Sequence, residues 1–327
     1  MISEQDFQAA TATFDRLRSS ISEVIVGHDA VVRFALISLL CKGNVLFEGV
    51  PGLGKTLLVR TLANALGLKF SRIQFTPDLM PADIVGTDIL TEKDGQREFS
   101  FAPGPVFANV VLADEVNRAT PKTQSALLEA MEERTVTVGA HTYRLEEPYI
   151  VLATQNPIEM EGTYPLPEAQ IDRFLLKAKV SFPSLAALVE ITERNTEGLG
   201  IQLPEATATA TDILNAREIV RAIPIAASLR EYIARLVLAT HPESEYSPAQ
   251  VKEYVEYGGS PRAAIALVIG AKAHAFLAGE VNVRREDIEA VFKAALTHRL
   301  VLNFRGEAEG ISSDSLLDEV WNKTATT

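Results

Sequence analysis

The chain has 327 residues, of which 47% are hydrophobic and 23% are charged, and its formal net charge is −12. These values are ordinary for a globular protein of two domains, and the negative charge disfavours nucleic acid or an anionic membrane as the main partner. Cys41 is the only cysteine, which excludes an internal disulfide and fits a reducing cytoplasm. The first residues lack a secretion signal, and the longest apolar stretch, 263–278, is interrupted by Lys272 and His274. We therefore expect a cytoplasmic protein that does not insert into a membrane.

The first predicted elements are two helices within residues 4–40, the second of which spans 29–40. Val26 and Gly27 lie between them, and a glycine there allows a sharp turn or a close approach of the backbone to another group. The apolar run 44–48 then predicts a short buried strand.

Residues 49–56 fit the pattern G-x-x-x-x-G-K-[ST] of a phosphate-binding loop. The strand before them and a helix predicted over 57–66 supply the context that this motif requires. Glycines let backbone N–H groups turn toward a phosphate chain, and the helix offers its positive N-terminal end. Lys55 is expected on the β- and γ-phosphates of ATP, and the Thr56 hydroxyl on Mg²⁺. The residues predicted to contact the nucleotide here are Gly49, Val50, Pro51, Gly52, Leu53, Gly54, Lys55, Thr56 and Leu57.

Two inserted segments are predicted within the first half of the chain. An alternating strand over 69–75 is followed by 84–101, which we interpret as a helix interrupted by a hairpin that turns at 93–96. A helix from Thr120 to Arg134 follows later, and residues 135–145 predict a second hairpin with a Gly-X turn.

Asp114 and Glu115 end a continuous apolar strand that begins at Asn109. In a phosphate-loop ATPase such a strand supplies a carboxylate for Mg²⁺ and a base for the attacking water, which would be the roles of Asp114 and Glu115. The alternative is a buried strand that ends in a solvated acidic turn. The phosphate loop earlier in the chain favours the catalytic interpretation.

Asn156 follows another buried strand, 149–154. A polar amide at the carboxyl end of a parallel strand lies where ligands bind in open α/β sheets, so Asn156 is a candidate to orient the attacking water with Glu115. A turn-forming asparagine before Pro157 is the alternative.

Strand signals vanish after Pro183, and the rest of the chain reads as helices over 184–198, 209–221, 226–240, 248–257, 261–279 and 284–298, with a short helix at 316–321. We therefore predict an α/β fold with a parallel sheet over residues 1–183, with inserts near 84–103 and 135–145, followed by a small all-helical domain over 184–327.

The chain resembles the MoxR branch of the AAA+ ATPases, which carries an insert at the second helix. The resemblance covers nearly the whole chain, and the most specific motifs come in its second half. The segments that carry it are 49–56, 113–118, 153–157, 166–174 and 259–263.

This resemblance implies several roles. Asp114 and Glu115 match the acidic pair of the family, and Asn156 matches its polar sensor residue. Val26, Gly27 and His28 match the segment beside adenine, although the family usually has glutamine where His28 stands. The resemblance also implies a ring-shaped homo-oligomer, most often a hexamer.

Two arginines acquire roles through the same resemblance. Arg173 matches the arginine that reaches into a neighbouring subunit's ATP, and Arg262 matches an arginine of the helical lid. From the residues alone, an ion pair of Arg173 with Asp172 or Glu168 and a solvent-facing Arg262 are the alternatives. Arg118 is a second candidate for a contact across subunits.

These motifs raise four candidate functions. The first is a chaperone-like motor that remodels or matures a client, in the family often one with a von Willebrand factor A domain. The second is a nucleic-acid motor similar to the MCM helicases, which the net charge of −12 disfavours. The third is the motor subunit of a complex like magnesium chelatase. The fourth, a regulator that binds ATP without hydrolysis, requires the loss of a catalytic residue, whereas Glu115, Asn156, Arg173 and Arg262 are all present.

Overall fold

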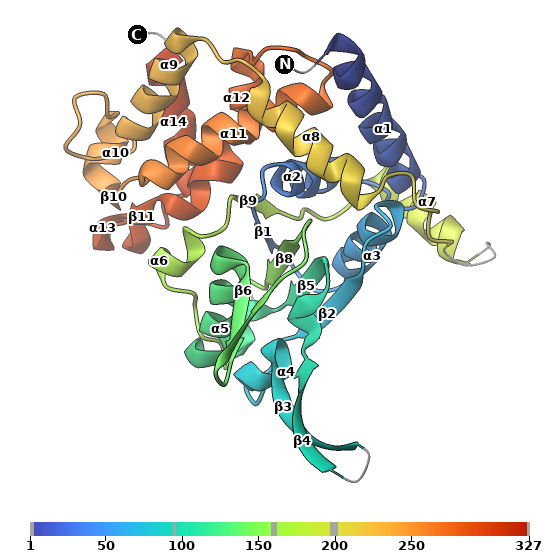
Figure 1. Cartoon of the computed structure of the whole chain (residues 1–327). Coiled ribbons are helices and arrows are strands. Elements are labelled where there is room, and N and C mark those ends of the chain that lie inside the picture. The colour runs from blue at the N-terminus through green and yellow to red at the C-terminus, as the bar shows by residue number, and fades with distance from the viewer. Residues whose placement is uncertain (1–2, 94–95, 158–161, 197–201, 326–327) are drawn as a thin grey trace. The chain divides into compact units, whose positions relative to one another are not determined.

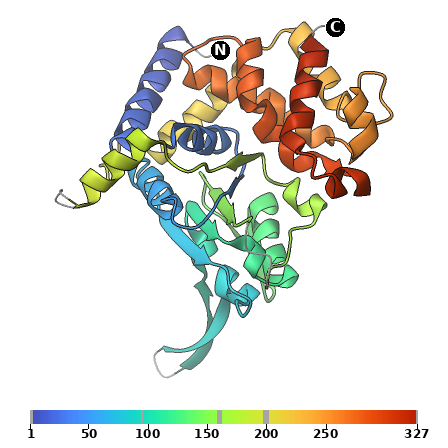
Figure 2. The same ribbon diagram turned by 180° about the vertical axis from the view of Figure 1, so that it is seen from behind.

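The computed structural model of the chain describes residues 3–93, 96–157, 162–196 and 202–325 (Figures 1 and 2). It divides into two compact units. The sheet unit comprises Thr13–Leu166 and Ala178–Leu214, and the helical unit comprises Met1–Ala12, Pro167–Lys177 and Asn215–Thr327. Residues 184–214 thus cluster with the sheet, and the domain boundary at residue 183 stays a prediction.

A five-stranded sheet forms the centre of the sheet unit. In sheet order its strands are β2 (Phe70–Gln74), β5 (Val110–Asp114), β8 (Ile150–Gln155), β1 (Val45–Glu48) and β9 (Leu176–Lys179). The pairs β2–β5, β5–β8 and β8–β1 are parallel. Every residue of β5 is buried, as expected for a parallel strand that is covered on both faces. Because these strands are parallel, their carboxyl ends lie along one edge of the sheet.

Helices were predicted where α2 (Asp29–Leu40), α3 (Lys55–Ala65), α5 (Pro121–Glu133) and α7 (Leu185–Thr196) lie, and these four are present. The unit also contains α4 (Pro81–Val85) and the 3-10 turns η1 (Pro105–Phe107) and η2 (Val116–Arg118), which were not predicted. Helix α1 (Glu4–Ser22), strand β9 and helix α8 (Ala210–Ala222) have residues in both units.

Two hairpins extend from the sheet unit. The first pairs β3 (Gly86–Lys93) with β4 (Gln96–Pro103), and it projects beyond the sheet in both views (Figures 1 and 2). The second pairs β6 (Thr135–Val138) with β7 (His141–Arg144) around Gly139, whose φ of +59° fits the predicted Gly-X turn.

The predicted helix within 84–101 is wrong. Helix α4 ends at Val85, because Gly86 adopts a φ of +93°, which breaks a helix. The residues that follow include Thr87, Ile89 and Thr91, and such β-branched side chains favour a strand. The turn predicted at 93–96 lies partly outside the described residues.

The helical unit contains α6 (Glu168–Ile171), α9 (Ala227–Leu238), α10 (Ala249–Tyr254), α11 (Pro261–Leu277), α12 (Arg285–Leu296), the 3-10 turn η3 (Thr297–Arg299), α13 (Phe304–Ala308) and α14 (Ser313–Ala325). The helix predicted over 248–257 ends at Tyr254, because β10 (Val255–Tyr257) pairs with β11 (Val301–Leu302) in a short ribbon that the sequence did not reveal. No helix in the described part of the chain is long and apolar enough to span a bilayer. An α/β unit with a parallel sheet and a helical lid confirms the predicted fold class.

Candidate functional site

The glycine loop between β1 and α3 has the conformation expected of a phosphate-binding loop. Gly52 and Gly54 have φ values of +84° and +76°, which side chains rarely adopt, and Gly54 is the residue that caps α3. A methyl group added to either would meet no atom within 4 Å. The loop therefore faces open space and directs the N-terminus of α3 into it, an arrangement that favours an anion.

Lys55 and Gly49 link the two ends of this loop. The Lys55 Nζ donates to the Gly49 carbonyl oxygen at 2.7 Å. A Cβ on Gly49 would lie 2.9 Å from the carbonyl oxygen of Val180, so the close approach of the chain requires glycine there. Burial lowers the pKa of the Lys55 ammonium, and the charges of Asp114 and Glu115 oppose that shift. Lys55 thus lies within electrostatic reach of both acids.

A cavity of 390 Å³ opens beside the loop. Its walls are largely apolar and come from three segments of the sheet unit: the α1–α2 connection with Val26, the loop and start of α3 with Leu53 and Leu57, and the stretch from Phe182 through α7 with Leu188 and Ile191. A concave site with apolar walls beside an anion site suits a flat heterocycle that carries phosphates.

Gly27 allows the α1–α2 connection to reach α7. Its φ is +77°, and an added Cβ would lie 2.9 Å from the Cβ of Ala187. His28, which lines the cavity, is buried. Burial lowers the pKa of His28, whereas a hydrogen bond with the backbone of Leu53 and the charge of Asp29 oppose the shift. The α7 residues of the wall were not predicted. Leu188, Ile191 and Asn195 recur at helical spacing, but this pattern does not tell what the helix face contacts.

Asp114 lies at the carboxyl end of β5 and is largely buried, with an exposed fraction of 8%. Its Oδ1 accepts from the Thr154 hydroxyl at 2.6 Å, and its Oδ2 accepts from Arg72 Nη2 at 2.6 Å. Thr154 is on β8 and Arg72 on β2, so Asp114 is held by the strands on both sides of its own. Neither partner was predicted from the sequence.

Glu115 follows Asp114 in the left-handed conformation, with φ +58°. Its N–H donates to the Thr154 hydroxyl at 2.8 Å. Its Oε2 accepts from Gln74 Nε2 at 2.9 Å and from Arg118 Nη1 at 3.0 Å. Arg118, predicted as a candidate for a contact across subunits, therefore contacts the acid of its own chain. Gln74 was missed, although its place at the end of β2 could have suggested it.

Asn156 is buried directly after β8, and its carbonyl oxygen accepts from Asn117 Nδ2 at 3.5 Å. The glycine loop lies at the carboxyl end of β1, Asn156 at that of β8 and the two acids at that of β5, and these three strands are neighbours in the sheet. The parallel strands therefore bring these predicted residues to one edge. Three sequence positions that are far apart thus form one candidate site.

The donor set near this edge suits Mg²⁺ together with a nucleotide. Thr56 is half-buried in the first turn of α3, and Asp114 offers a carboxylate. Among the described residues, no group of three or more His, Cys, Asp or Glu side chains could hold a metal ion alone. Mg²⁺ commonly binds through one or two protein oxygens and substrate phosphates, and the residues present fit that mode.

Arg173 and Arg262 belong to the helical unit. Arg173 is exposed just after α6. Arg262 is the second residue of α11, which the Ser260 hydroxyl caps, and its Nη1 lies 3.7 Å from Asp172 Oδ2. The roles of both arginines stay predictions.

Two family models match the chain. The model described as ATPase family associated with various cellular activities (AAA) matches residues 44–176, and the AAA lid domain model matches residues 248–320.

Relatives match over nearly the full length. Chaperone MoxR1 of Mycobacterium tuberculosis is 43% identical over 319 residues, which cover 97% of this chain and 83% of the relative. Protein MoxR of Methylorubrum extorquens is 32% identical, with 91% and 89% covered. The crystal structure of a candidate ATPase from Cytophaga hutchinsonii superposes with a TM-score of 0.91 at 41% identity, covering 98% of this chain and 96% of that one.

Proposed function

This chain belongs to the MoxR family of AAA+ ATPases, and on that basis we propose that it hydrolyses ATP with Mg²⁺ and uses the energy to remodel, mature or activate a client protein. The observation that carries the proposal is the edge of the parallel sheet, where the glycine loop, Asn156 and the pair Asp114–Glu115 come together. These are the groups that phosphoryl transfer to water requires.

Each residue has a chemical task in this proposal. The loop N–H groups and Lys55 bind the phosphates, and Thr56 and Asp114 hold Mg²⁺, which neutralises charge on the phosphate oxygens. Glu115 accepts a proton from the attacking water, and Asn156 orients that water. Positioning and charge neutralisation supply most of the acceleration in such a reaction.

We expect the cavity beside the loop to bind the adenine. Leu188→Asp places a charge in its apolar wall and should raise the Kd for ATP at least about tenfold, equivalent to about 1.4 kcal/mol. Val189→Asp is a matched control, because Val189 is the next residue of α7, is similarly exposed (47% against 37%) and does not line the cavity. Titration with a fluorescent ATP analogue measures the Kd of each variant. Equal Kd values for the two variants would contradict this assignment.

We propose that the active form is a ring of identical subunits, specifically a hexamer. The role assigned to Arg173 needs a neighbouring subunit. Arg173→Ala should lower kcat strongly. Mixing it with Glu115→Gln subunits should restore turnover, since the latter offer an intact Arg173 to the intact acids of the former. Phosphate release at a fixed total protein concentration measures the effect. A strictly additive mixture would argue against a shared site.

The client is proposed to be a protein, with a von Willebrand factor A domain protein as the first candidate. The β3–β4 hairpin supports a protein partner, because Ile89, Leu90 and Phe99 are exposed, Phe99 to 78%. Exposed apolar side chains on one element are typical of a protein-binding surface.

A further inference from the structure

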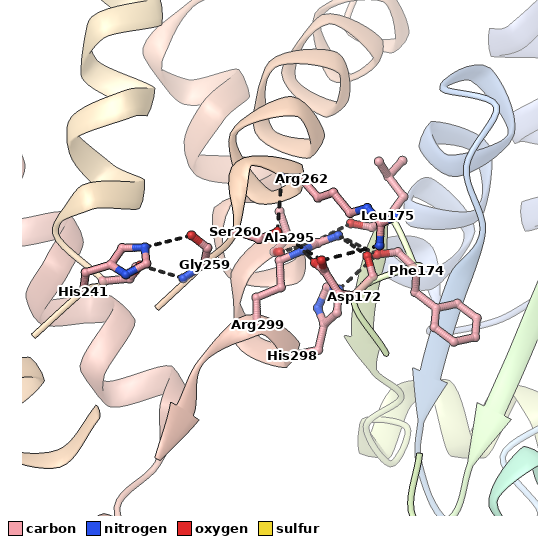
Figure 3. Close-up of polar contacts among 11 residues, drawn as sticks. Asp172, Phe174, Leu175, His241, Gly259, Ser260, Arg262, Ala295, His298 and Arg299 are labelled. Atoms are coloured by element: carbon pink, nitrogen blue, oxygen red, sulfur yellow. Dashed lines mark hydrogen bonds and ion pairs between the residues drawn. The ribbon is translucent and has the colours of Figure 1, made fainter. Parts of the chain in front are cut away.

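Arg299 is a buried arginine whose hydrogen bonds all lie within the helical unit (Figure 3). Its side chain is 3% exposed. A guanidinium has five N–H donors, and each can be assigned an acceptor here. Nε donates to Asp172 Oδ1 at 2.6 Å, Nη2 to the carbonyl oxygens of Asp172 and Phe174 at 3.1 and 2.8 Å, and Nη1 to those of Leu175, at 3.2 Å, and Ala295.

Three of these acceptors are backbone carbonyl groups that flank Arg173 on both sides. A further bond joins the same segment to η3, because His298 Nε2 lies 3.1 Å from the Phe174 carbonyl oxygen. A carbonyl only accepts, so Nε2 carries the proton. Burial, with Arg299 nearby, lowers the pKa of His298 well below its ordinary value. The segment 172–175 is therefore clamped to η3 by two neighbouring side chains.

The same clamp is connected to the first turn of α11. The Oδ2 of Asp172 accepts from the Ser260 hydroxyl at 3.0 Å, and Ser260 in turn caps the helix that carries Arg262 (Figure 3). Asp172 thus balances the charge of Arg299 with one oxygen and contacts α11 with the other. The segment around Arg173 has a fixed place within its unit.

We propose that Arg299 is a positioning residue for Arg173. By fixing the backbone on both sides of Arg173, it presents that side chain in one orientation to the ATP of the neighbouring subunit. The proposal rests on the role in trans proposed for Arg173. Lysine cannot replace Arg299, because a single ammonium lacks the planar fork and has three donors rather than five.

Arg299→Lys tests the proposal while it keeps the positive charge beside Asp172. We expect kcat for ATP hydrolysis to fall about 100-fold, the loss that a displacement of about 1 Å can cause, with KM for ATP within about twofold of the unchanged protein. Mixing this variant with Glu115→Gln subunits should restore turnover, because the Glu115→Gln neighbour presents a correctly placed Arg173. A merely destabilised subunit would not be rescued by its neighbour.

Arg217→Lys is the matched control, because Arg217 and Arg299 are both 7% exposed as whole residues and both belong to the helical unit. It should show kcat within about threefold of the unchanged protein. Should Arg299→Lys fail to fold, Asp172→Glu, which keeps the negative charge beside Arg299 but displaces the carboxylate by one methylene, undergoes the same mixing test with the same expected rescue.

The outcomes separate this inference from the proposed function. Unchanged kcat in Arg299→Lys would overturn the inference. The same holds for a loss that mixing does not restore while Arg173→Ala is restored, since the role of Arg173 in trans would then stand without Arg299. If mixing restores turnover neither to Arg299→Lys nor to Arg173→Ala, both proposals are overturned.

Discussion

Replacing Glu115 with glutamine is expected to lower kcat for ATP hydrolysis by about 10²- to 10⁴-fold, the usual contribution of a general base. The amide cannot accept the proton of the attacking water. It retains an oxygen for the bonds that Gln74 and Arg118 now donate to Oε2, so the Kd for ATP should stay within about twofold. Phosphate release and titration with a fluorescent ATP analogue measure the two quantities. Glu129→Gln, an exposed acid on α5, serves as the control and should change neither.

If Glu115→Gln retains ATP turnover, Glu115 is not the general base. If the variant loses both turnover and ATP binding, the role of Glu115 is structural. If the variant binds ATP without splitting it, it also serves to test the client. A von Willebrand factor A domain protein that binds the ATP form and not the ADP form would support the remodelling function. Binding of DNA in its place would favour the nucleic-acid motor.

Asp172→Ala is expected to destabilise the helical unit by about 3–5 kcal/mol, because it leaves the buried charge of Arg299 without its counter-ion. Trp321, the only tryptophan, belongs to this unit and lies 5.1 Å from the Phe292 ring between centroids. Its fluorescence during urea denaturation therefore reports the unfolding of this unit.

Glu231→Ala is the matched control for that measurement. Glu231 also pairs with an arginine of the helical unit, Arg235, but the two side chains are 65% and 35% exposed. An exposed pair of this kind contributes about 0–1 kcal/mol. Similar small losses for Glu231→Ala and Asp172→Ala would show that the pair Asp172–Arg299 does not stabilise the unit as we infer.

The sequence predicted the glycine loop, the acids and Asn156 correctly as features that end strands. Each signal is local: a glycine pattern between a strand and a helix, or a polar residue directly after an apolar run. Because the strands are parallel, their carboxyl ends, and the residues found there, lie along the same edge of the sheet. The insert 84–103 was predicted less well, because its apolar and β-branched residues are compatible with both a helix and a hairpin. The positive φ of Gly86, which excludes the helix, is seen only in the structure.

What the sequence alone determined is thus the fold class, the family and the chemical groups at the ends of β1, β5 and β8, because these depend on short patterns and regular geometry. The tertiary structure alone decided which side chains hold those groups. Arg72 meets Asp114 across 42 residues of sequence, and Arg299 meets Asp172 across 127. No periodicity or motif encodes such pairs, since they form only after the strands have been ordered in the sheet and the helices have packed within their unit.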